Sequence, residues 1–445
     1  MNNAIARYFQ LDKFQTTIRT EIIAGISTYL SLAYIFIVSP AILSQAGIDP
    51  KAALFATAVS ASLATLAMGL WANLPFAVAP GLTMSSYFVF VVCNKMHLSW
   101  QQGLATVCVS GVICVILTAL PLRQAIIDSI PQGLKRAITV TIGTFVAAIG
   151  LFISHILVYT PSGMIDPSAF DAAHLTGPLA IVMLFGLAVS ALLGLKRLNF
   201  PAGMIVAILL ASLLHHALLP SPEAVATGGN ILASFGQLDF SVFFDSRFWL
   251  PVIVFFVLDF FEGIGEFIGM TGNTSIQDKD GNVSNMKQAL WIDGLGTIGG
   301  SLLGTSSLIV FVESAVGIKA GGRTGLTAVV CALLMMLGVA AGFYFLPVLA
   351  LIPAQAASGV LVYVGYLILS GAVGPKTPGS LPSFDAAIAF IMSAIALATF
   401  SLDKSLAFGL WAYFAASLIP GRSHKPAGWL GVIAGALTAA IACSG

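Results

Sequence analysis

Two interrupted apolar stretches, Pro75-Phe-Ala-Val-Ala-Pro-Gly81 and Gly304-Thr-Ser-Ser307, decide how this chain of 445 residues folds. Each follows an apolar helix that opens with a similar run, Lys51-Ala-Ala-Leu-Phe55 in the first half and Lys287-Gln-Ala-Leu-Trp291 in the second. Short segments that Gly or Pro interrupts at matching positions of two halves are typical of inverted-repeat transporters, where they mark the binding site. The pair therefore predicts an internal repeat with a binding site at its two breaks.

The composition around these breaks is that of a membrane protein. Hydrophobic residues make up 58% of the chain and charged residues 8%, whereas a soluble domain carries roughly 25% charged residues. A transmembrane helix needs about 20 apolar residues, so a chain of this length and composition holds about twelve to fourteen crossings with short loops. It has no room for a separate catalytic domain. We predict an all-α polytopic membrane protein of about fourteen transmembrane segments. The candidate spans include 22–43 and 287–303, and 383–399 and 403–419 can be two half-spans of one V-shaped crossing.

Charge fixes the expected orientation and excludes other classes of protein. With the N-terminus inside, only Lys51, Lys95, Arg247 and Lys404 of the 19 Lys and Arg residues fall outside, so positive charge predicts a cytoplasmic N-terminus. The near balance of 19 basic and 18 acidic residues gives no nucleic-acid footprint. The five scattered cysteines favour neither a disulfide framework nor a metal site, and the polar N-terminus does not resemble a removable signal peptide.

Three acids interrupt one apolar segment, 252–269: Asp259, Glu262 and Glu266. Spacings of three and four residues place them along one helical face. An ionisable side chain at mid-bilayer costs about 2.5 to 3.5 kcal/mol on insertion scales, so it usually faces a cavity or a partner. Since three neighbouring charges would also repel one another, we expect at least one to hold a proton at neutral pH. A structural stripe against a polar helix is the alternative, above all for Asp259.

The second break carries a further acid, Glu313, within a predicted helix over 305–318. A 14-residue helix is about 21 Å long, so it would cross only part of the roughly 30 Å hydrocarbon layer. A half-helix presents unpaired backbone N–H groups at mid-membrane, which is tolerated only beside a protein cavity. We therefore place Glu313 in the binding site, whereas Asp293 is interpreted first as a bracing contact between helices.

Such a cavity would offer carboxylate acceptors beside backbone donors. A planar heterocycle with ring N–H and C=O groups satisfies both sets, and Tyr87 or Phe311 can stack on its face. Ser85, directly after the first break, can supply a hydroxyl. Carboxylates would repel an inorganic anion, and a simple cation would leave the amides unused.

These residues also carry a family resemblance, over nearly the whole chain. The chain resembles the adenine/guanine/hypoxanthine permease branch of the nucleobase:cation symporter (nucleobase-ascorbate transporter) family. The runs that carry it are Ala24-Gly-Ile-Ser-Thr-Tyr-Leu-Ser-Leu-Ala-Tyr34, Ala72-Asn-Leu-Pro-Phe-Ala-Val-Ala-Pro-Gly81, Gly304-Thr-Ser-Ser307, Glu313-Ser-Ala-Val-Gly-Ile318 and Gly321-Gly-Arg-Thr-Gly-Leu-Thr-Ala-Val329.

The resemblance implies a seven-plus-seven inverted repeat in which a core domain moves against a gate domain in an elevator-like or rocking cycle, usually in a homodimer. It implies proton-coupled import of a purine nucleobase across the bacterial inner membrane, with the proton as coupling ion and no other cofactor. The expected parts are a cytoplasmic N-terminus (1–20), core segments 21–121 and 247–345, and gate segments 122–246 and 346–445.

By matching position, the resemblance implies that Glu262 and Glu313 grip the base, that Tyr87 and Phe311 face its ring, and that Asp293 braces the site. Ser85, directly after the first break, is a further candidate for the lining. Glu262, Glu266 and Glu313 are the candidates for carrying the proton, with Glu266 added because it lies one turn beyond Glu262 on the same helical face. Structural support is expected from Asp259, Asp293 and Ser306. The branch usually has Asp at the position of Glu262, Thr at Glu266, Asn at Ser85 and more hydroxyls across 307–309. These departures leave the preferred purine open.

Other readings stay open at this level. The same fold can carry another nucleobase, such as xanthine or uracil, or another small solute. A channel would conduct without saturation, and an intramembrane enzyme would need a nucleophile or metal constellation, which the sequence does not contain.

Overall fold

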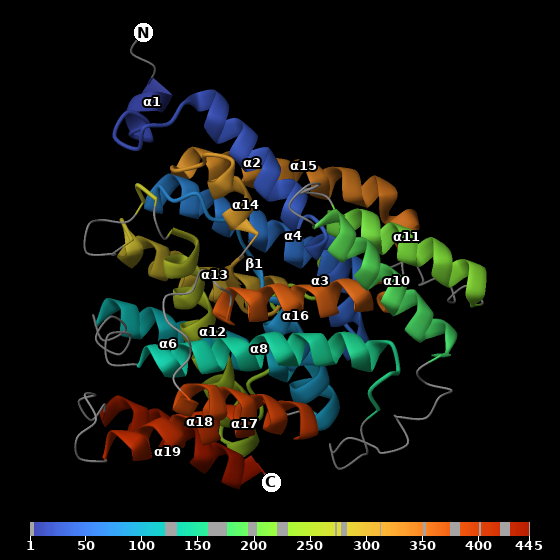
Figure 1. Cartoon of the computed structure of the whole chain (residues 1–445), viewed down its shortest axis with the longest axis vertical. Coiled ribbons are helices and arrows are strands. Elements are labelled where there is room, and N and C mark those ends of the chain that lie inside the picture. The colour runs from blue at the N-terminus through green and yellow to red at the C-terminus, as the bar shows by residue number, and fades with distance from the viewer. Residues whose placement is uncertain are drawn as a thin grey trace.

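The computed structural model describes residues 4–120, 131–158, 176–194, 203–219, 230–271, 274–276, 283–311, 313–349, 353–373, 383–399, 402–418 and 428–444. These residues form helices almost throughout (Figure 1), which confirms the all-α prediction. The first half contains α1 (Ala4–Tyr8), α2 (Ile18–Leu32), α3 (Ile35–Leu43), η1 (Ser44–Ala46), α4 (Pro50–Ala67), η2 (Met68–Ala72), β1 (Val78–Pro80), α5 (Leu82–Ser86), η3 (Tyr87–Lys95), α6 (Trp100–Ala119), α8 (Gln132–Ile153), α10 (Pro178–Leu193) and α11 (Gly203–Leu218).

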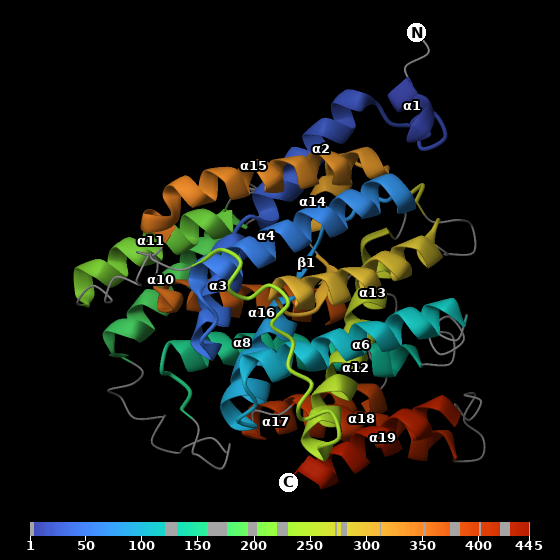
Figure 2. The ribbon, with the colours of Figure 1, turned by 180° about the vertical axis from the view of Figure 1, so that it is seen from behind.

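The second half contains α12 (Ser246–Thr271), α13 (Met286–Leu303), β2 (Leu308–Val310), α14 (Ser314–Lys319), α15 (Gly325–Leu349), η5 (Ala354–Ala357), α16 (Ser358–Val373), α17 (Ser383–Thr399), α18 (Leu402–Ser417) and α19 (Gly428–Ser444). The two halves interleave in space, since α15 packs against α2 and α4, α13 packs against α6, and α16 packs along α8. Figure 2 shows the same arrangement from behind, with α2, α4 and α15 near one end and α17 to α19 near the other.

Several helices are long and apolar enough to cross a membrane. By length and composition they are the helical stretches Ile18–Ala46, Pro50–Ala72, Trp100–Ala119 and Gly133–Ile153, and shorter apolar helices follow in both halves of the described chain. The predicted boundaries agree closely at 287–303 and 383–399, which form α13 and α17. The predicted span 22–43 is two helices, because the chain breaks at Ala33 and Tyr34. The number of crossings stays a prediction.

The two predicted breaks meet inside the molecule as a two-stranded antiparallel pair. Val78 lies opposite Val310, Ala79 opposite Ile309 and Pro80 opposite Leu308. The pairing continues at both ends, where Phe311 N donates to Ala77 O at 2.9 Å and Gly81 N donates to Ser307 O at 3.0 Å. Backbone N–H and C=O groups that lack helical partners in one break therefore form hydrogen bonds with the other break.

A threonine from the helix before each break completes this pairing. Thr65 on α4 donates to Val78 O at 3.0 Å and accepts from Val78 N at 2.9 Å. Thr297 on α13 makes the same two bonds with Leu308, each at 3.2 Å. The matching devices in the two halves agree with the predicted internal repeat.

The prediction of one helix over 305–318 is wrong. Gly304 ends α13 in a left-handed conformation (φ 106°), residues 308–310 form β2, and the described residues from 305 to 319 are helical only over Ser314–Lys319. The run Leu308-Ile-Val-Phe311 is rich in β-forming residues, and β1 offers it the hydrogen-bond partners that lipid cannot supply. Residues 308–310 therefore pair with β1 as a strand instead of forming part of a half-helix.

Gly325 offers a test of the close packing of α15 against η2, which continues α4. A Cβ at this position would overlap the main-chain oxygen of Gly69 and would lie 2.9 Å from Asn73 Cα. We expect Gly325→Ala to destabilise the protein by about 1–3 kcal/mol, because rigid backbone must move apart. Thermal unfolding of the purified protein in detergent measures this effect.

Gly299→Ala is the matched control, because Gly299 is also helical and a Cβ there would meet nothing within 4 Å. We expect this variant to unfold at or above the wild-type temperature. Equal melting temperatures for the two variants would contradict the close contact.

Candidate binding site beside the paired chain breaks

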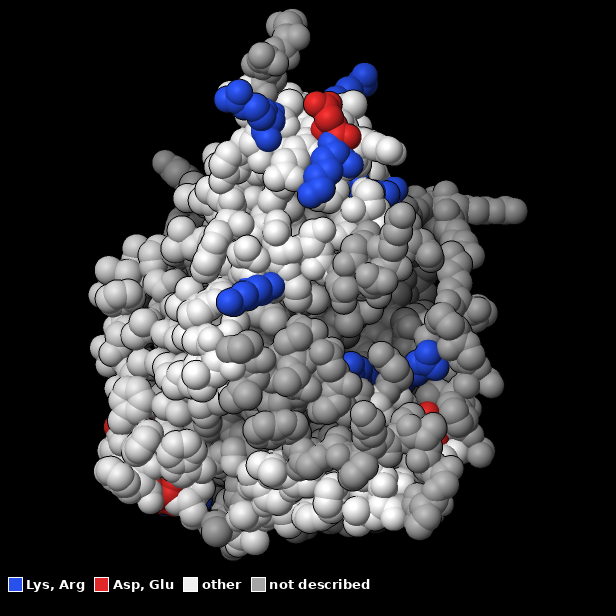
Figure 3. Space-filling model, turned by 90° about the vertical axis from the view of Figure 1, so that its left-hand side faces the viewer, with Lys and Arg blue, Asp and Glu red and all other residues white. Residues whose placement is uncertain are grey.

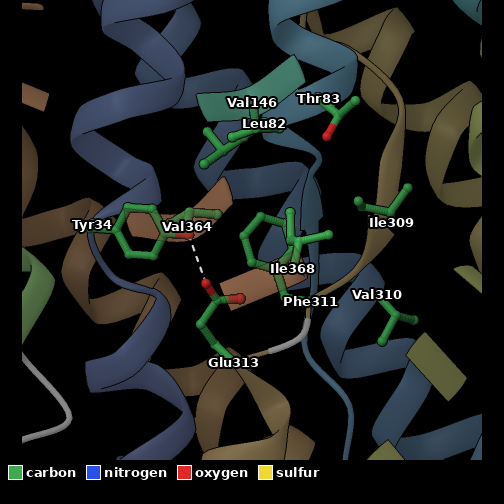
Figure 4. A pocket seen from close by; sticks show the side chains of 10 residues that line it. All are labelled: Tyr34, Leu82, Thr83, Val146, Ile309, Val310, Phe311, Glu313, Val364 and Ile368. Atoms are coloured by element: carbon green, nitrogen blue, oxygen red, sulfur yellow. Dashed lines mark hydrogen bonds between the residues drawn. The ribbon is translucent and has the colours of Figure 1, made fainter. Parts of the chain in front are cut away.

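A cavity lies directly beside the strand pair (Figure 4). Its lining residues are Tyr34, Leu82, Thr83, Val146, Ile309, Val310, Phe311, Glu313, Val364 and Ile368. They come from the α2–α3 junction, the start of α5, the β2–α14 segment, α8 and α16. The two breaks thus form one side of the cavity, and the other is formed by α8, which follows the first break in the chain, and α16, which follows the second.

Glu313 and Tyr34 provide the polar centre of the cavity. The Tyr34 hydroxyl donates a hydrogen bond of 2.7 Å to Glu313 Oε1, and the Glu313 side chain is only 6% exposed. Glu313 directly precedes α14, and Tyr34 lies where α2 gives way to α3. Both side chains therefore sit at chain breaks, where the backbone turns them into the cavity rather than along a helix.

The rest of the lining is mainly apolar. Thr83 adds one hydroxyl and Phe311 one aromatic ring, while Leu82, Val146, Val364 and Ile368 supply aliphatic surface. A buried carboxylate needs a hydrogen-bonding or charged partner, since an apolar environment stabilises its charge poorly. The cavity is suited to a flat ligand that donates a hydrogen bond to Glu313 and fills the apolar remainder.

The structure brings two of the predicted ligand residues, Glu313 and Phe311, into the cavity. Ser85 and the predicted support residue Ser306 lie against each other instead, with 2.7 Å between their hydroxyl oxygens. Tyr87 is fully buried and packs edge-on against Phe255 with 5.2 Å between ring centroids. Neither Ser85 nor Tyr87 is among the residues that line this cavity.

The remaining acids lie around α12. Asp259 Oδ2 accepts a hydrogen bond from Cys114 Sγ at 3.2 Å. Asp293 is fully buried, and a Cβ built on Gly263 of α12 would lie 4.0 Å from each of its carboxyl oxygens. The bracing role expected of both stays a prediction.

The side chains of Glu262 and Glu266 lie outside the described residues, so their convergence with Glu313 stays a prediction. Their helix is suitably placed, since α12 packs against both β2 and α14. Among the described residues, no group of three His, Cys, Asp or Glu side chains could hold a metal ion.

Sequence reasoning missed Tyr34, Thr83 and the aliphatic wall. A hydroxyl inside the apolar run 22–43 was a usable signal for Tyr34. Val146, Val364 and Ile368 gave none, because an apolar side chain that faces a cavity looks the same in sequence as one that faces lipid.

Known proteins resemble this chain over nearly its whole length. Residues 19–374 match the profile of a family described as the permease family. The adenine permease AdeP of Escherichia coli (strain K12) is 32% identical over 420 residues, which are 94% of this chain and 91% of that protein. The guanine/hypoxanthine permease PbuG of Bacillus subtilis (strain 168) is 30% identical over 433 residues, which are 94% and 95% of the two chains.

Solved structures share the fold at low sequence identity. The transmembrane domain of a cyanobacterial bicarbonate transporter, BicA, superposes with a TM-score of 0.65 at 15% identity and covers 88% of this chain and 97% of that one. The murine anion transporter Slc26a9 gives a TM-score of 0.61 at 14% identity, over 90% and 68% of the two chains. These similarities confirm the predicted class of multi-segment membrane fold.

The Ser85–Ser306 contact offers a test of how the breaks are joined. Replacing either serine by Ala leaves the other hydroxyl buried without this partner, so each single variant should lose about 1–2 kcal/mol of stability. The double variant should lose less than the sum, because no hydroxyl is then left behind. Thermal unfolding of the four proteins in detergent measures the cycle, and strictly additive losses would contradict the contact.

Proposed function

This chain belongs to the permease family, and from that premise we propose that it is a symporter that imports a purine nucleobase together with protons. A permease is a transporter, so the prediction that the chain is not an enzyme is confirmed. One observation supports the purine most directly. A buried carboxyl, Glu313, stands beside an aromatic ring, Phe311, in a cavity that is otherwise mainly apolar.

A purine base fits this chemistry. Its ring N–H groups can donate to Glu313, and its face can stack on Phe311 while the aliphatic side chains exclude water. An anion such as bicarbonate would meet a carboxylate instead of a donor, although the fold is shared with anion transporters. The relatives named as adenine and guanine/hypoxanthine permeases support the same ligand class.

The free-energy cost of burying the Glu313 charge supports proton coupling. An empty cavity leaves the Glu313 carboxylate with the Tyr34 hydroxyl but away from water. Binding of a proton removes that charge, whereas hydrogen bonds donated by the ligand stabilise it. In the proposed cycle, protonation of Glu313, Glu262 or Glu266 accompanies docking of the base from outside, and release of both to the inside resets the carrier.

The position of the cavity supports alternating access. Tyr34, Thr83 and Glu313 belong to the predicted core segments 21–121 and 247–345, whereas Val146 and Val364 belong to the predicted gate segments 122–246 and 346–445. Movement of one set against the other would take apart the wall of the cavity. We place the transporter in the bacterial inner membrane as a homodimer that cycles by an elevator-like or rocking motion.

Surface charge supports a cytoplasmic N-terminus. Arg7, Lys13 and Arg19 are all exposed in or near the N-terminal segment. Figure 3 shows Lys and Arg side chains gathered around that segment at one end of the molecule. An excess of basic residues is characteristic of the cytoplasmic side.

Uptake of radiolabelled bases tests the proposed function. In a bacterium that lacks its own nucleobase permeases, expression of this chain should give saturable uptake of adenine, guanine or hypoxanthine. Competition by unlabelled adenine, guanine, hypoxanthine, xanthine and uracil then identifies the preferred base. A protonophore should abolish accumulation; accumulation that survives it would reject proton coupling, and the absence of any purine uptake would reject the function.

Variants of the polar pair test the site itself. Glu313→Gln should lower uptake by roughly 10- to 100-fold, because it removes a charged hydrogen-bond acceptor. Tyr34→Phe should lower it by roughly 3- to 10-fold, because it removes one neutral donor. Initial uptake rates, normalised to the amount of protein in the membrane, measure both effects.

Tyr413→Phe is the matched control, because it removes an equivalent hydrogen bond of 2.6 Å from a tyrosine to a carboxylate, Asp385, away from the cavity. Full uptake by Glu313→Gln would reject the site. An equal loss in Tyr34→Phe and Tyr413→Phe would show that the effect is not specific to the cavity.

A further inference from the structure

A further buried carboxylate, Glu21, lies in the first turn of α2 and does not line the cavity. It is fully buried, and its carboxylate oxygens accept hydrogen bonds from the turn between α14 and α15 and from the start of α15. Oε1 accepts from Arg323 N at 2.9 Å, and Oε2 accepts from Thr324 N at 3.2 Å and from the Thr327 hydroxyl at 2.6 Å.

These contacts explain the run Gly321-Gly-Arg-Thr-Gly325. Gly321 turns the chain with a φ of 105°, and the following amides stand at the start of α15, where helical partners are absent. A carboxylate there both accepts their hydrogen bonds and complements the positive end of the helix. The Arg323 side chain points back instead, donating to Ile318 O at 2.5 Å and to Gly322 O at 2.7 Å.

Helix α2 also contacts α14, at the other end of the segment that runs from Glu313 to Thr324. Gly317 in the middle of α14 touches Ala24 and Thr28 so closely that a Cβ would overlap the Thr28 hydroxyl. Tyr34, just beyond α2, holds Glu313, which directly precedes α14. The segment from Glu313 to Thr324 is thus held at three positions: by Glu21, by Ala24 and Thr28, and by Tyr34. These positions span roughly 20 Å along the axis of α2.

We propose that Glu21 is a positioning residue for ligand binding. By fixing the turn at 321–324 against α2, it sets where α14 docks and thereby where the Glu313 carboxyl meets the Tyr34 hydroxyl in the cavity. This inference rests on the proposed purine function, because its readout is the affinity for the base. Glu21 itself touches neither the cavity nor the ligand.

The chemistry of the contact requires a carboxylate. Glu21 receives two backbone N–H groups and one hydroxyl, and only the hydroxyl can rotate to accept a bond in return. A Gln side chain would keep one acceptor oxygen but would turn an NH₂ donor toward backbone donors. Glu21→Gln should therefore displace the turn even though it preserves the volume of the side chain.

Purine affinity of the purified, full-length protein tests the proposal. With radiolabelled adenine, guanine or hypoxanthine, whichever the wild type binds best, Glu21→Gln should weaken binding by roughly tenfold. Tyr34→Phe should weaken it by roughly 3- to 10-fold, and the double variant should bind no more weakly than the weaker single variant, because both act on the same contact. Asp49→Asn is the control: Asp49 also accepts two amides, Lys51 N and Ala52 N, at the start of a helix, α4, and its loss should change affinity by less than about twofold.

Thermal unfolding accompanies each measurement. If Glu21→Gln does not fold, Glu21→Asp replaces it, because the shorter acid keeps the charge but must draw the turn toward α2, and it too should weaken binding. Wild-type affinity in a folded Glu21 variant overturns the proposal, and so do factors that multiply in the double variant. A wild type that binds no purine overturns the proposed function and this inference with it, whereas a wild type that binds normally beside an unaffected Glu21 variant rejects this inference alone.

Discussion

Backbone hydrogen bonding away from water is the constraint on which this structure depends. A helix that stops inside a membrane leaves N–H and C=O groups with no water to satisfy them. Here the two interruptions form backbone hydrogen bonds with each other through β1 and β2. The hydroxyls of Thr65 and Thr297 bond the remaining N–H and C=O groups of one residue on each strand. Neither break would be tolerable alone, so the two halves of the chain have to meet at this point.

The binding cavity is a consequence of that meeting. Strands leave the helical path and turn side chains such as Phe311 and Glu313 toward a space that continuous helices would have filled. The short helix α14 then returns the chain to α15 along the surface of α2. The Glu313 carboxyl is thereby held by the Tyr34 hydroxyl on one side and by the closely packed segment from α14 to α15 on the other.

The shared fold does not carry the chemistry of the ligand. A bicarbonate transporter and an anion transporter have the same arrangement of helices at 14–15% identity, yet this cavity presents a carboxyl, two hydroxyls and apolar surface. Function resides in the side chains placed on a scaffold, not in the scaffold. In this cavity the carboxyl of Glu313 would repel an anion if it carried a charge.

The membrane class, the positions of the two breaks and two residues of the cavity, Glu313 and Phe311, can be predicted from the sequence alone. These features are local: composition, interruptions by glycine and proline, and an acid in an apolar run are all visible without knowing what lies nearby. The three-dimensional contacts are needed to show that the second break is a strand, that Tyr34 is the partner of Glu313, and that Val146 and Val364 line the cavity. Each of these depends on a contact between segments far apart in the chain, and in lipid an aliphatic side chain carries no mark of whether it faces a cavity, a helix or an acyl chain.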